Sequence, residues 1–145
     1  MTPAARAQAA IEILDQVIAS ARDDGAPADA LVSAYFKTRR YAGSKDRRAV
    51  RELVFRAIRH SAEVPASGRA ALLPLVPELF DGAGHGPAAP SDDEPRAGAG
   101  IVPGWIAPLL SPLVSEDEWP ALTERAPLDL RANRSEEHTS ELQSH

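Results

Sequence analysis

Residues 43–60 constrain the fold of this chain more than any other stretch, because helix, core and charge signals coincide there. Its apolar residues recur at spacings of three and four, which places them on one face of a helix. These residues are Val50, Leu53, Val54, Ala57 and Ile58. The arginines of the stretch fall largely elsewhere on the helical wheel. The pattern predicts an amphipathic helix with one buried face and one face that meets a negatively charged partner.

Positive charge is concentrated around this helix. The formal net charge of the chain is -5, but residues 37–60 contain nine Lys or Arg residues against two acidic ones. Nine positive and two negative charges give +7 locally and leave -12 for the rest of the chain. A clustered basic patch is what phosphate recognition needs, whatever the total charge. The candidate phosphate-contacting residues are Arg39, Arg40, Lys45, Arg47, Arg48 and Arg51.

Two alternatives remain for these basic residues. Guanidinium groups suit phosphate, because they offer forked donors and a permanent charge. The same arginines could instead pair with Asp46, Glu52 or acids elsewhere in the domain and stabilise helix packing, and we expect Asp46 to be mainly structural. The nearby aromatic residues Tyr35, Phe36 and Tyr41 could stack on bases, but we expect at least two of them to be buried in the core.

The first 80 residues predict an all-α bundle. Threonine, serine or proline stands at the start of the apolar-periodic stretches, as is usual where helices begin. We expect Thr2, Ser44 and Ser67 to cap helices. The expected helices cover about residues 3–21, 27–36, 44–60 and 68–73, so residues 1–80 form one helical domain.

The composition changes after residue 80. Residues 81–100 contain five glycines, three prolines and an acidic run, which predicts a flexible loop without a core. Residues 101–126 should hold two short helices anchored on the bundle by Trp105 and Trp119. Residues 127–133 alternate apolar and polar residues, which favours a short strand.

Several classes of function are excluded by what the sequence lacks. The chain contains no cysteine, which removes disulfides, thiolate zinc sites and cysteine nucleophiles. We predict no catalytic residue and no metal ligand. The sequence also contains no apolar run of membrane-spanning length and no secretory signal pattern. We therefore expect a cytoplasmic protein without membrane contact.

The last twelve residues, 134–145, differ in composition from the rest. Residues 134–144 read Arg-Ser-Glu-Glu-His-Thr-Ser-Glu-Leu-Gln-Ser. This is, in order, the translation of a widely used short-read sequencing adapter. We therefore expect residues 134–145 to be an artefact that interrupts the natural reading frame after Asn133, and we leave them out of the functional interpretation. The alternative is an ordinary disordered C-terminus.

A longer pattern resembles a known family. Residues 43–59 read Gly-Ser-Lys-Asp-Arg-Arg-Ala-Val-Arg-Glu-Leu-Val-Phe-Arg-Ala-Ile-Arg, and residues 125–133 read Arg-Ala-Pro-Leu-Asp-Leu-Arg-Ala-Asn. With Ala4-Ala5-Arg6 and residues 102–106, they resemble the NusB-like N-terminal domain of Sun/Fmu-type RNA cytosine-C5 methyltransferases, over nearly all of residues 1–133. The helix motif is shared with free-standing NusB antitermination factors, whereas the pattern at 125–133 separates the two groups.

The resemblance implies a NusB-like helical bundle that contacts ribosomal RNA through the six basic candidates. In that family a Rossmann-like catalytic domain follows, which binds S-adenosylmethionine and uses two cysteines. Neither its glycine-rich cofactor loop nor any cysteine is present here, so we expect residues 127–133 to begin a truncated catalytic region and this chain to be inactive and to bind no cofactor. Two alternatives stay open: a free-standing antitermination-type RNA-binding factor, and a helical protein-interaction module.

Overall fold

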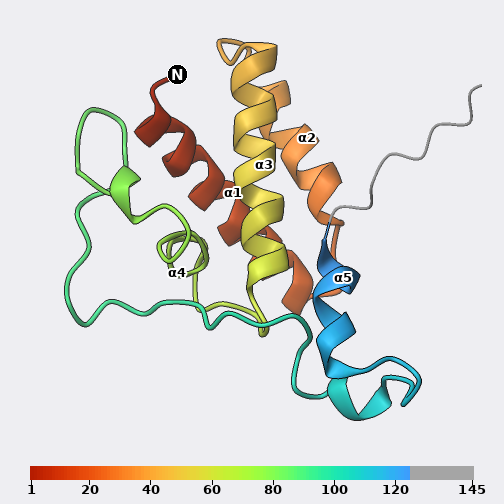
Figure 1. Cartoon of the computed structure of the whole chain (residues 1–145). Helices are drawn as coiled ribbons and strands as arrows, with labels where there is room; N and C mark the ends of the chain where they lie inside the picture. Colours follow the sequence, from red (N-terminus) through yellow and green to blue (C-terminus); the bar gives the residue numbers. More distant parts are fainter. Residues whose placement is uncertain (125–145) are drawn as a thin grey trace, which may run out of the picture.

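The computed structural model describes residues 1–124, and their regular structure is almost entirely helical (Figure 1). Within these residues the exception is one isolated antiparallel bridge between Ser61 and Ala99. The all-α prediction is therefore confirmed for this part of the chain. The strand expected at 127–133 and the tail at 134–145 lie outside the described residues.

Three helices form the body of the bundle, and their boundaries lie close to those expected from the sequence. Thr2 caps the first one as predicted, because its Oγ1 accepts a hydrogen bond from the Ala5 N–H at 3.1 Å. Proline then occupies the first helical position, where no backbone donor is needed. The helices are α1 (Pro3–Arg22), α2 (Ala28–Lys37) and α3 (Ser44–His60).

The cap of α3 differs from the prediction, although the span of the helix agrees with it. Gly43, not Ser44, is the N-cap: its backbone is extended and its carbonyl accepts a hydrogen bond from the Arg47 N–H at 3.0 Å. Ser44 is already helical, so its hydroxyl cannot cap the helix. Glycine is also accepted at N-caps.

The remaining elements are short. Ser67 caps the fourth helix as predicted, accepting from the Ala70 N–H at 3.1 Å. The Glu118 carboxylate accepts from the Ser115 N–H at 2.9 Å, as in a capping box. These elements are α4 (Gly68–Leu72), η1 (Pro77–Leu79), η2 (Ala107–Leu109), η3 (Glu116–Glu118) and α5 (Trp119–Thr123). The expected anchor Trp105 leaves 68% of its surface exposed.

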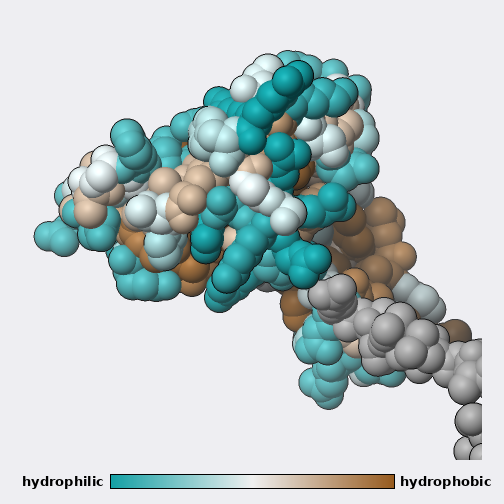
Figure 2. All heavy atoms as spheres, turned by 90° about the horizontal axis from the view of Figure 1, so that it is seen from above, coloured by the Kyte–Doolittle hydropathy of each residue, from teal (hydrophilic) through white to brown (hydrophobic). Residues whose placement is uncertain are grey.

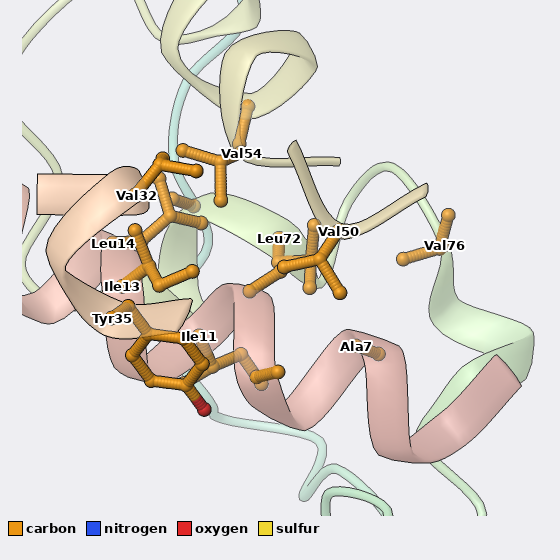
Figure 3. Close-up of a cluster of buried hydrophobic side chains, with 14 of the residues drawn as sticks. Ala7, Ile11, Ile13, Leu14, Val32, Tyr35, Val50, Val54, Leu72 and Val76 are labelled. Carbon is orange, nitrogen blue, oxygen red and sulfur yellow. The ribbon is translucent and has the colours of Figure 1, made fainter. Parts of the chain in front are cut away.

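The core lies between α1, α3 and α4, with α2 closing one side (Figure 3). Its largest fully buried side chains come from three helices and the turn after α4: Ile13, Leu14, Val50, Val54, Leu72 and Leu73. The buried face predicted for α3 is confirmed at Val50, Val54 and Ala57. Ile58, which was placed on that face by its spacing, is 38% exposed because it sits at the rim near the end of the helix.

Gly68 allows α4 to lie directly on α1. A Cβ atom at this position would stand 2.3 Å from the carbonyl oxygen of Ile11 and 2.9 Å from the Cβ of Leu14. The Gly68 N–H donates to the Asp15 carboxylate at 2.6 Å. The two backbones are therefore closer than any side chain would permit, and an ionic hydrogen bond links them.

Residues 81–100 contain no helix or strand, yet they are attached to α4. The Arg69 guanidinium donates to the Glu94 carboxylate, with Nη2 and Oε2 2.9 Å apart, and to the carbonyl of Ala88 at 2.9 Å. The Ala97 N–H donates to the carbonyl of Ala70 at 2.9 Å. The hydrogen bonds from Arg69 hold the pKa of Glu94 below its usual range. The segment predicted as a flexible loop thus has defined attachments along its length.

No helix among residues 1–124 is both long enough and apolar enough to cross a lipid bilayer.

Candidate nucleic-acid interface

A groove of about 390 Å³ opens between α2 and α3. Three of its lining residues come from α2 and three from α3, and the α3 residues are all predicted phosphate contacts. The lining residues are Val32, Ser33, Phe36, Arg47, Arg48 and Arg51. The spacing along α3 explains this grouping, because positions i, i+1 and i+4 lie on neighbouring parts of one helix surface.

Aromatic rings and a backbone carbonyl hold two of these arginines. Arg47 Nε donates to the carbonyl oxygen of Ala42 at 2.8 Å, and its Cζ lies 5.7 Å from the centre of the Phe36 ring. Arg51 Cζ lies 5.2 Å from the centre of the Phe55 ring. Both distances fall within the range of cation–π attraction. These contacts orient the guanidinium groups without neutralising them.

Among the described residues, no carboxylate compensates the charge of the three groove arginines, Arg47, Arg48 and Arg51. Within residues 1–124, no carboxylate forms an ion pair with Arg47, Arg48 or Arg51. All three side chains are exposed. The positive potential along this face of α3 is therefore available to an anionic ligand.

Arg39 is placed differently from the groove arginines. Its Nη2 lies 3.3 Å from Glu12 Oε2, and its Nη1 donates to the carbonyl of Tyr35 at 3.3 Å. Its Cζ also stacks 3.6 Å above the centre of the Tyr35 ring. The internal ion-pair alternative therefore holds for Arg39, which links α2 to α1. Arg40 and Lys45 are exposed near the corner between α2 and α3 and are not among the groove-lining residues.

Asp46 has the structural role expected of it, but its partners come from the N-terminus and from α1. Its carboxylate accepts from Arg6 Nε at 2.9 Å and from the Met1 amino group at 3.2 Å. These hydrogen bonds, with that from Arg6 the larger effect, lower the pKa of Asp46. The other acid of the helix, Glu52, pairs with Arg59 at 3.5 Å on the exposed surface.

The aromatic residues divide as predicted. Tyr35 and Phe36 are each 5% exposed and meet edge to face, with their ring centres 5.2 Å apart. Figure 3 shows the Tyr35 ring against the core, with its hydroxyl at the edge of the cluster. Burial, and then the hydrogen bond donated to Glu12, raise the pKa of Tyr35 above its usual value. Tyr41, by contrast, is 74% exposed.

Sequence reasoning missed the contribution of α1 to this end of the molecule. Arg6 neutralises Asp46, and Glu12 accepts hydrogen bonds from Tyr35, Arg39 and Gln8. No local pattern marks these residues, because their partners lie 23 to 40 positions away except for Gln8. Figure 2 views the molecule from this end, and hydrophilic residues cover much of the surface that it shows.

The described residues contain no group of three or more His, Cys, Asp or Glu side chains placed to hold a metal ion. Comparison with protein-family models, with curated proteins and with solved structures finds no match for this chain.

Proposed function

We propose that residues 1–80 are a NusB-like RNA-binding module that positions substrate for an S-adenosylmethionine-dependent ribosomal RNA cytosine-C5 methyltransferase in the cytoplasm. The single observation that carries RNA binding is the grouping of Arg47, Arg48 and Arg51 at the α2–α3 groove, where no carboxylate of residues 1–124 forms an ion pair with them. Catalysis would belong to a separate domain of that enzyme and not to this module.

The geometry of the groove favours a phosphate backbone as the ligand. Arg47 uses Nε on the Ala42 carbonyl, which leaves its terminal N–H groups to form the forked pair of hydrogen bonds that phosphate oxygens accept. Arg48 lies beside it on the same helix surface, and Arg51 follows one turn later. Consecutive phosphates of a nucleic acid can engage such a row of cations, and each contact releases counterions.

RNA affinity measured over a range of salt concentrations tests this proposal. We expect single-stranded RNA to bind the chain with an affinity that falls steeply as salt rises. Replacing Arg47, Arg48 and Arg51 together by alanine should weaken binding at low salt. The slope of log K against log salt should fall by about 2, since each single-strand phosphate contact contributes about 0.7.

Arg56→Ala is the matched control. Arg56 lies on the same helix and carries the same charge, but it is not among the groove-lining residues. We expect its replacement to lower the salt slope by less than one phosphate contact. Binding that is absent, or equally strong at all salt concentrations, would contradict RNA binding and favour the helical protein-interaction module. An equal loss of affinity in Arg56→Ala and in the triple Arg47, Arg48 and Arg51 variant would contradict the groove as the site.

The methyltransferase part of the proposal is supported by the resemblance over nearly all of residues 1–133, above all by the pattern at 125–133. The genomic DNA downstream of the Asn133 codon tests it. We expect a continuing reading frame that encodes a glycine-rich cofactor loop and two cysteine motifs. A genomic frame that instead encodes the residues at 134–145 would contradict this part and favour the free-standing antitermination-type factor. Methyl transfer by this chain alone would contradict it as well.

A further inference from the structure

A depression larger than the basic groove is lined in part by the corner between α2 and α3. It has a volume of about 820 Å³, within the range of small-ligand sites, and is lined by α1, the end of α2, the following corner and His85. The corner connects the two features: Tyr41 lines the depression, and the next residue, Ala42, holds Arg47 of the groove through its carbonyl oxygen. A strand of RNA that binds the groove arginines and crosses this corner would reach the depression.

One hydrogen-bond network forms the polar wall of the depression. Glu12 Oε2 accepts from the Tyr35 hydroxyl at 2.7 Å and from Arg39 Nη2 at 3.3 Å. Its other oxygen, Oε1, accepts, among donors of residues 1–124, only the long bond from Gln8 Nε2 at 3.4 Å. A carboxylate has about four acceptor positions, so Oε1 retains capacity for another donor. The Gln8 side-chain oxygen accepts no hydrogen bond within residues 1–124.

Tyr41 provides an exposed aromatic surface beside these acceptors. Its side chain is 74% exposed at the rim of the depression, although nearby Tyr35 and Phe36 are buried. Exposed aromatic rings beside basic residues are the usual platforms for unpaired bases, because every base has a π-face. Arg39, already stacked on Tyr35, presents its remaining N–H groups to the same space.

We infer that this depression holds an unpaired RNA base that stacks on Tyr41 and that bases with an exocyclic amino group are preferred over uracil. The inference rests on the proposed RNA-binding function and assigns it a base-recognition subsite. Phosphate is disfavoured here because Glu12 already pairs with Arg39, and the remaining acceptor oxygens of Glu12 and Gln8 offer no donor to a phosphate oxygen. The acceptors on Glu12 and Gln8 match the amino groups of cytosine and adenine, whereas uracil offers carbonyl oxygens at those positions.

Fluorescence anisotropy with labelled oligo(C), oligo(A) and oligo(U) of equal length tests the subsite. The full chain should bind oligo(C) and oligo(A) roughly two- to ten-fold more tightly than oligo(U), as one extra hydrogen bond provides. Tyr41→Ala should weaken binding of every oligonucleotide by about five- to a hundred-fold, the range of one stacked base. Its salt slope should not change, because tyrosine carries no charge. Tyr41→Phe should bind like the original chain.

Gln8→Ala should reduce the preference for oligo(C) over oligo(U), whereas Gln16→Ala should keep it. Gln16 is the matched control, because it lies on α1 but its amide donates to the backbone carbonyl of Glu12 outside the depression. If Tyr41→Ala binds RNA normally while the triple groove variant binds it weakly, the subsite is refuted and the phosphate interface stands. Equal affinity of the original chain for oligo(C) and oligo(U) would refute the amino-group preference. If no RNA binds, the proposed function fails at the first step.

Discussion

Replacing Gly68 by alanine tests the contact that joins α4 to the bundle. The added Cβ would stand 2.3 Å from the carbonyl oxygen of Ile11, while ordinary contact begins at 3.4 Å, so the backbones must separate by about 1 Å. This separation would also stretch the 2.6 Å hydrogen bond from the Gly68 N–H to Asp15. Overpacking and partial loss of a charge-assisted hydrogen bond together predict a loss of about 2–4 kcal/mol in the free energy of unfolding.

Urea unfolding followed by circular dichroism provides the measurement. A loss of this size should lower the unfolding midpoint by roughly 1–2 M urea. Gly98→Ala is the matched control, because no atom lies within 4 Å of the position that its Cβ would take. We expect that variant to be as stable as the original chain or slightly more so, since alanine restricts the unfolded state. Equal midpoints for the Gly68 and Gly98 variants would refute the close approach of α1 and α4.

Three further predictions concern the same bundle. Leu72→Ala should lower the free energy of unfolding by about 2–5 kcal/mol, measured by urea titration, because Leu72 is fully buried. Because the pKa of Asp46 is lowered in the fold, its hydrogen bond to Arg6 stabilises the fold fully above the usual carboxyl pKa. This stabilisation is lost as the pH falls through the lowered pKa. Asp46→Asn should therefore be less stable than the original chain at pH 7 and lose less stability on acidification. Arg69→Ala should release the segment bonded through Glu94, which faster cleavage within residues 87–97 by a protease of broad specificity would reveal.

The body of the fold could be predicted because its signals are local. The spacing of Val50, Val54 and Ala57 identified the buried face of α3, and Thr2 and Ser67 marked two helix starts correctly. The prediction failed at Ser44 for a physical reason. Glycine and serine are both accepted as N-caps, so the position of the extended residue in the turn decides between them.

The attachment of residues 81–100 could not be predicted from composition. Glycine, proline and charge indicate that this segment lacks a core of its own, and it contains no regular element. They do not reveal that Arg69 reaches Glu94, 25 residues later, or that the Ala97 N–H meets the carbonyl of Ala70. Ion pairs between distant positions carry no periodic signature, so their partners emerge only once the helices are placed.

The same difficulty applies to the candidate interface, where six basic residues looked equivalent in the sequence. Helix α1 distinguishes them: its Glu12 neutralises Arg39, and its Arg6 satisfies Asp46, the acid nearest in sequence to Arg47 and Arg48. Had Asp46 remained without Arg6, its carboxylate would have been an acceptor for the arginines beside it. By supplying one carboxylate and one guanidinium at the right places, α1 commits Arg39 to packing and leaves the charge of the groove arginines directed outward. A chain of net charge -5 can therefore present a locally cationic surface.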